Sequence, residues 1–238
     1  MDFIKKIDFL FALFYFLSCV TIGSVWFYDN SILGFLIPIL VSLVGIIYVR
    51  RIEKINWWYL CSLVFLMVSF FLNYYYGFKE LLSVINLTMG SFYLISAYIV
   101  YTFLNKEKVK KDKIFTLPVY ITLGLIFYLI YAFIDLLYEQ IRHGLVCIAF
   151  CITSLFLYVT SSYLVYSTQV YKGSIRLILI VSTWMFLNSM IPINELLFYH
   201  KIFASLIVIN IIVGIVFFLI FLLQTKPENN PNETEHFL

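Results

Sequence analysis

The chain has 238 residues, of which 63% are hydrophobic and only 12% are charged, and its formal net charge is +3. A soluble domain carries about a quarter charged residues, so this composition excludes a soluble globular protein. A transmembrane β-barrel is excluded as well, because barrel strands alternate apolar and polar residues, whereas segments such as 206–209 and 217–220 are apolar throughout.

Eight hydrophobic stretches follow one another along the chain, and a hydrocarbon core about 30 Å thick needs about 20 apolar residues per helix. We expect membrane spans at residues 9–28, 31–49, 56–76, 81–104, 114–134, 144–167, 177–193 and 202–224. The first stretch is longer than the apolar part of a signal peptide, so it is expected to remain as a helix. The sequence predicts an all-α integral membrane protein, a bundle of about eight transmembrane helices in one domain over residues 1–224. Residues 225–238 are polar and are expected to form a short disordered cytoplasmic tail.

The basic residues predict the orientation of this bundle. Most of the 16 Lys and Arg residues fall near the N-terminus and in the loops at 50–55, 105–113 and 168–176, whereas the alternate loops hold only Lys79, Arg142 and Lys201. By the positive-inside rule, both termini are expected to face the cytoplasm. The dense basic run at residues 106–113 is interpreted as a topology signal, and contact with anionic lipid or an acidic partner is the alternative.

Polar residues inside the spans are amides, hydroxyls and thiols, since no Asp, Glu, Lys or Arg falls near a membrane midplane. Two spans carry them at helical spacing, which places them on one face of each helix. In the fourth span these residues are Asn86, Gly90, Tyr93, Ala97 and Tyr101, and in the sixth they are Cys147, Cys151, Ser154, Tyr158, Ser161 and Val165. The last two spans add Asn188 and Asn210.

Two interpretations of these stripes stay open. Small and hydrogen-bonding residues line contacts between transmembrane helices, so the stripes indicate helix packing first. The alternative is a polar cavity for a lipid headgroup or a small ligand. Asn86, Asn188 and Asn210 favour this alternative, because the predicted orientation places all three amides in the outer half of the bilayer.

A metal site is a further hypothesis. His143, Cys147 and Cys151 are four residues apart at the start of the sixth span, so they stack on one helical face. One His and two Cys are suitable ligands for a soft metal ion. Structural zinc sites, however, normally take ligand pairs from two separate elements, and the second element is missing here. Packing cysteines below an interfacial His are the alternative.

Three segments resemble the YhhN-like lysoplasmalogenase family of multi-pass membrane proteins. Residues 90–101 are similar to that family's span with Gly, an Ala-His pair and Tyr, with Tyr98 in place of the His and Tyr101 matching. Residues 154–162 are similar to its Leu-Phe…Ser-Asp segment, with Ser161 matching and Ser162 in place of the Asp. Residues 183–191 resemble its Thr-Tyr-Tyr…Gln…Leu-Ile stretch, with Asn188 in place of the Gln.

This resemblance implies a helical bundle related to enzymes that cleave the vinyl ether bond of lysoplasmalogens. The polar positions of the family are substituted in this chain, and the order of the helices also differs. A retained hydrolase activity would therefore depend on Tyr, Ser and Asn side chains. Together, the stripes and the resemblance give one set of candidate ligand-binding residues, which comprises Asn86, Tyr93, Tyr98, Tyr101, Tyr158, Ser161, Ser162, Asn188 and Asn210.

The leading functional hypothesis is a non-enzymatic bundle that binds a lipid or a small hydrophobic ligand, or packs against another membrane protein or a second copy. A divergent lysoplasmalogenase-like hydrolase and a membrane sensor or transport subunit are the alternatives. No nucleotide-binding or catalytic motif appears, so neither a cofactor nor a nucleic-acid partner is expected. The high content of Ile, Phe, Tyr, Lys and Asn is typical of an AT-rich prokaryotic genome and suggests the cytoplasmic (inner) membrane of a bacterium.

Overall fold

The computed structural model describes residues 9–27, 30–105, 134–171 and 173–225, together with the isolated positions 124, 128, 131 and 132. The long helices are α1 (Phe9–Phe27), α2 (Leu33–Arg51), α3 (Trp57–Tyr75), α4 (Leu82–Tyr101), α7 (Leu145–Thr168), α8 (Ile175–Pro192) and α9 (Lys201–Gln224). In the described part of the chain, seven helices are long and apolar enough to cross a membrane. The protein is therefore a helical multi-pass membrane protein.

Seven of the predicted spans correspond to these helices with ends that agree within three residues. The remaining span, at 114–134, lies almost entirely outside the described residues, so the prediction of eight helices stays a prediction. One predicted loop is wrong: residues 134–141 are helical and continue through a 3-10 turn at Arg142–Gly144 into α7. Of the predicted tail, Thr225 is buried against the bundle, and residues 226–238 lie outside the described residues.

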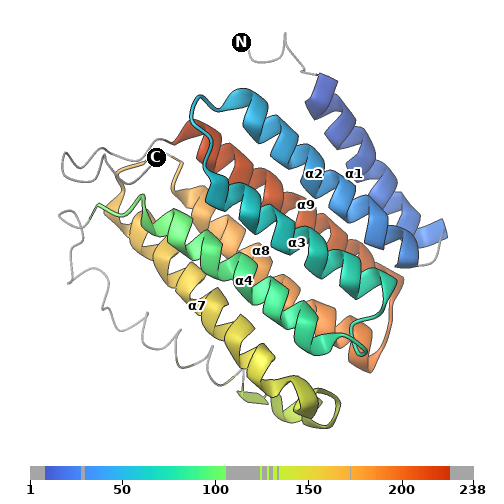
Figure 1. Ribbon diagram of the computed structural model, residues 1–238. Helices are drawn as coiled ribbons and strands as arrows, with labels where there is room; N and C mark the ends of the chain where they lie inside the picture. The colour runs from blue at the N-terminus through green and yellow to red at the C-terminus, as the bar shows by residue number, and fades with distance from the viewer. Residues whose placement is uncertain are drawn as a thin grey trace.

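Contacts between helix ends define the two ends of the bundle. The Arg51 guanidinium at the end of α2 lies 4.7 Å from the ring centre of Phe11 at the start of α1. At the opposite end, Lys201 Nζ at the start of α9 donates to the carbonyl oxygen of Trp26, 3.0 Å away. We call these the Arg51 end and the Lys201 end. Helix α1 begins and α9 finishes at the Arg51 end, so the described chain starts and stops on the same side (Figure 1).

The helices form two layers. Helices α1, α2, α3, α4 and α7 lie side by side in one layer, with α9 and α8 behind them (Figure 1). Aromatic rings connect the layers: Trp184 of α8 lies 4.9 Å from Phe92 of α4, and Phe218 of α9 lies 5.4 Å from Tyr59 of α3, measured between ring centres. Burial of these large rings between helices that share few polar groups stabilises the stacking of the two layers.

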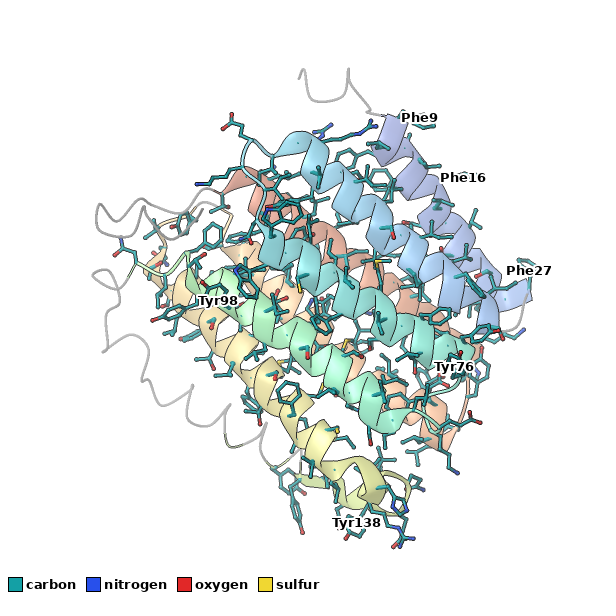
Figure 2. The ribbon with its side chains drawn as sticks, viewed as in Figure 1. Phe9, Phe16, Phe27, Tyr76, Tyr98 and Tyr138 are labelled. Atoms are coloured by element: carbon teal, nitrogen blue, oxygen red, sulfur yellow. The ribbon has the colours of Figure 1, made fainter. Side chains whose placement is uncertain are left out.

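The outside of the bundle is apolar and aromatic. Phe9, Phe16 and Phe27 lie along the outer edge of α1, and Tyr98 and Tyr138 also point away from the bundle (Figure 2). A helix satisfies its backbone N–H and C=O groups internally, so such side chains can face hydrocarbon at no polar cost. This surface is the one that a lipid bilayer requires.

Short polar motifs set where the helices begin and end. The Asn56 side chain accepts a hydrogen bond from Trp58 N and caps the start of α3, a role for which Asn is well suited. At the Lys201 end, α8 continues past Pro192 into a π-helical turn at Ile193–Leu197, in which Phe198 N donates to Ile193 O at 3.2 Å. Glu195, which the sequence placed in a loop, lies in this turn. The wider turn leads the chain toward α9 beside the pocket described next.

Candidate functional site

A pocket of about 580 Å³ opens between α3, α4, α7 and α8, in the half of the bundle nearer the Lys201 end. Cavities of about 300–1,000 Å³ are typical of small-molecule sites. Its apolar lining includes Phe70, Phe78, Ile85, Met89, Leu137, Ile141, Ile148, Ile152, Leu155, Phe156, Val159, Met185 and Ile191. Its polar lining consists of Ser69, Asn73, Asn86, Cys151, Thr160, Asn188 and Ser189. The described lining is thus mainly hydrocarbon with a few hydrogen-bonding groups.

The pocket is elongated along α7. Its lining on this helix runs from Ile148 to Thr160, a distance of about 18 Å at 1.5 Å per residue. Three of the lining residues, Thr160, Phe186 and Ser189, are exposed on the outside of the described bundle. The described lining therefore reaches the side of the described bundle between α7 and α8.

Asn188 connects three helices at the wall of this pocket. Its Nδ2 donates to the Tyr93 hydroxyl of α4 and to the carbonyl oxygen of Trp184 in its own helix, the latter at 2.9 Å. Its Oδ1 accepts a weak hydrogen bond from Cys151 Sγ of α7 at 3.6 Å. Since both ends of the amide have partners within the bundle, the main role of Asn188 in this structure is to hold α8 against α4 and α7.

Asn73 on α3 differs from Asn188. It lines the same pocket and is only 4% exposed, yet neither Nδ2 nor Oδ1 has a hydrogen-bond partner among the described residues. A buried polar atom without a partner costs about 1–3 kcal/mol, so such atoms in a native protein need an explanation. The pocket beside Asn73 supplies the space for an occupant that would pair with this amide.

The other two predicted amides have different positions. Asn86 lines the pocket, and its Nδ2 donates to Leu82 O in its own helix at 2.8 Å. Asn210 donates to Leu206 O on α9 at 2.8 Å and is not part of the lining. Two of the three amides that were expected at one depth therefore share a cavity, and the third does not.

Aromatic rings close the pocket toward the middle of the bundle. On α4 and α8 the lining stops at Met89 and Met185. Tyr93 lies one turn beyond Met89, and Trp184 is the residue next to Met185. The Tyr93 ring centre lies 5.9 Å from that of Trp184 and 6.4 Å from that of Tyr158. These three side chains are completely buried and do not line the cavity, so they separate the pocket from the Arg51 half.

The small-residue stripes pack against each other, as the packing interpretation expects. A Cβ on Gly90 of α4 would lie 2.6 Å from ring atoms of Phe150 and 3.1 Å from the Cα of Cys151 on α7. A larger residue would require the Phe150 ring or α7 itself to shift. Gly90 is therefore a close-contact residue between the two helices that also form one wall of the pocket.

Besides Tyr93, Tyr158 and Asn210, four more predicted ligand residues lie outside the described pocket lining. Tyr98 and Tyr101 are 53% and 46% exposed on the surface, and the Tyr98 ring centre lies 5.7 Å from that of Trp58. Ser161 is half-buried, whereas its neighbour Ser162 is fully buried with a hydroxyl that has no partner among the described residues. The alternation between these serines shows that helix rotation decides which one faces the interior.

The three residues of the metal hypothesis differ in how deeply they are buried. His143 is exposed, Cys147 is half-buried and Cys151 is buried. Within the described ranges, no three His, Cys, Asp or Glu side chains are close enough to hold a metal ion. The thiol of Cys151 instead contacts the Asn188 amide.

Asn73 is not among the ligand-binding residues predicted from the sequence. The signal for it exists, because Ser62, Ser69 and Asn73 are spaced by seven and four residues and all three are buried on one face of α3. No family model matches the chain, and neither a curated protein nor a solved structure matches it.

Proposed function

We propose that this multi-pass membrane protein binds the hydrocarbon chain of a single-chain lipid in the pocket between α7 and α8. The observation that carries the proposal is the shape of this pocket, which is long, mainly apolar and open toward the lipid-facing surface. A lipid tail can enter it sideways from the bilayer and needs no passage through water. In the pocket, the lipid tail packs closely against protein side chains. This contact favours binding over the looser contact with mobile lipid chains in the bilayer.

The charge distribution supports a specific orientation of this site. Arg50, Arg51, Lys54 and Arg176 lie at or near the Arg51 end, whereas Lys79, Arg142 and Lys201 lie at the other end. By the positive-inside rule, the Arg51 end, where the described chain starts and stops, faces the cytoplasm, in our proposal that of a bacterium. The pocket then opens to the outer leaflet of the cytoplasmic membrane.

The resemblance to the lysoplasmalogenase family adds a candidate occupant, a lysolipid. Of the positions that carry the resemblance, Asn188 lines the pocket, while Tyr98 and Ser161 do not. The polar groups that the described lining offers are amides, hydroxyls and one thiol. These groups can bind and orient a lipid by hydrogen bonding. We therefore propose lipid binding as the function, and hydrolysis of a lysolipid in the same pocket requires an assay of its own.

Native mass spectrometry of the protein extracted in a mild detergent tests the proposal. The wild type is expected to retain one single-chain lipid per protein. Leu155→Trp should abolish retention, because Leu155 lines the pocket and the indole would fill the space between α7 and α8. Leu157→Trp is the matched control, since Leu157 is 49% exposed on the outside of the same helix.

The comparison of these two variants decides the outcome. Loss of the lipid in the Leu155 variant alone would support a binding site in the pocket. Equal retention in both variants, with only bulk membrane phospholipids attached, would show that lipid binds to the surface and not to the cavity. A light-activated cross-linking lipid, mapped by peptide sequencing, should label residues 148–160 and 185–192 in the first case.

A further inference from the structure

The unpartnered amide of Asn73 indicates which headgroup the pocket would accept. Both amide atoms lack partners among the described residues, and the side chain is more than nine-tenths buried at the pocket. An amide Nδ2 is a donor and its Oδ1 is an acceptor. A ligand that satisfies both must therefore carry an acceptor and a donor close together.

Neutral hydroxyl and carboxamide groups meet this requirement, because each both donates and accepts hydrogen bonds. An ester offers only acceptors and would leave Oδ1 of Asn73 unpaired. A phosphate is charged, and the described lining contains no Lys, Arg or His to pair with it. A buried charge without a partner is strongly unfavourable, so the site discriminates against an anionic headgroup.

The positions of the other amides favour Asn73 as the anchor. Nδ2 of Asn188 donates to Tyr93 and Trp184, and Nδ2 of Asn86 donates to Leu82 of its own helix. Asn73 is the amide in the described lining whose two polar atoms are both unpaired. The Asn73 amide can turn toward an occupant without breaking a hydrogen bond between helices, because it makes none among the described residues.

We infer that the pocket selects a single-chain lipid whose headgroup is uncharged and both donates and accepts hydrogen bonds, such as a fatty alcohol or a primary fatty amide, with Asn73 as the pairing residue. This inference rests on the proposed function. In the bound state, the hydrocarbon chain lies along α7 and the headgroup lies between Asn73 of α3 and the start of α4.

A ligand series with one common chain tests the inference. Oleyl alcohol, oleamide, methyl oleate, octadecene and oleoyl lysophosphatidylcholine compete for the wild-type protein in micelles with a diazirine-bearing oleyl alcohol probe, and cross-linking is quantified by mass spectrometry. The alcohol and the amide should compete about tenfold or more better than the methyl ester and the alkene, because the latter leave buried polar atoms unpaired. The lysophospholipid should compete no better than the methyl ester.

Asn73→Leu should remove this preference, so that alcohol, ester and alkene compete equally, while Asn210→Leu should retain it. Equal competition by all headgroups in the wild type, or a preference that survives in Asn73→Leu, would overturn the inference and leave chain binding intact. Preferential binding of the lysophospholipid would overturn it as well and favour the lysolipid occupant. If none of the compounds displaced the probe, the proposed function itself would fail.

Discussion

The two halves of the bundle have similar residues but differ in how their interiors are filled. In the Arg51 half, aromatic rings meet across helices and fill the interior: Tyr48 and Tyr59 lie 4.6 Å apart, Phe218 lies 5.4 Å from Tyr59, and Phe103 lies 5.2 Å from Phe221. In the Lys201 half, the side chains between α3, α4, α7 and α8 leave a cavity. The described interior is therefore filled with contacting rings at one end and has a pocket at the other.

The difference shows that cavity formation depends on which side chains meet, and not on local hydrophobicity. Three large rings, those of Tyr93, Tyr158 and Trp184, form the boundary between the halves. Beyond them toward the Lys201 end, the lining consists mostly of flexible aliphatic and thioether side chains. Such side chains adapt to an occupant more readily than packed rings do.

Removal of the ring at the boundary should have the largest effect. Trp184 is fully buried and contacts Phe92, Tyr93 and the Gly214 backbone position of α9. Trp184→Ala should lower the free energy of unfolding by about 3–5 kcal/mol, the usual cost of such a cavity. Unfolding by SDS in mixed micelles, followed by circular dichroism, measures this change.

Trp58→Ala serves as the control, because Trp58 is 54% exposed and its loss should cost about 0.5 kcal/mol or less. If both substitutions cost the same, the aromatic boundary would not divide the bundle into a rigid and an open half.

A smaller effect is expected where α4 touches α7. Gly90→Ala brings a methyl group within 2.6 Å of the Phe150 ring, so that ring or the whole helix has to shift. Overpacking of this kind costs about 1–3 kcal/mol. The same unfolding measurement should show a loss in that range, accompanied by weaker retention of lipid because one pocket wall has moved.

Gly23→Ala is the matched control in α1. A Cβ at Gly23 meets nothing within 4 Å, so stability should stay the same or rise by up to about 1 kcal/mol through the higher helix propensity of Ala. A destabilised Gly23 variant would show that glycine matters here for a reason other than close contact.

The smallest predicted effect concerns the amide that joins three helices. Asn188→Leu removes the hydrogen bonds to Tyr93 and Cys151 and should cost about 0.6–1.7 kcal/mol, the range for hydrogen bonds between transmembrane helices. Asn210→Leu should change stability by less than about 0.5 kcal/mol, because Asn210 bonds only to its own helix. Equal costs would contradict the connecting role of Asn188.

Much of the architecture follows from the sequence. The seven described spans were predicted within three residues of their ends, because continuous apolar stretches about 20 residues long have few alternatives to a membrane helix. Gly90, Tyr93 and Ala97 of the predicted stripe on α4 are buried on one side of the helix, as the 3.6-residue period requires, whereas Tyr101 of the same stripe is exposed.

The sequence did not predict which helix faces meet, or where they leave space. Asn73 and Asn188 are separated by more than a hundred residues and share one pocket, while Asn210 at a similar expected depth does not join them. Periodicity gives the face of a single helix but not its rotation against neighbours, which is set by the packing of particular side chains such as Trp184 against Gly214. The sequence by itself determined a multi-pass helical membrane protein. The tertiary structure decided the pocket, because a cavity is a property of several packed helices together.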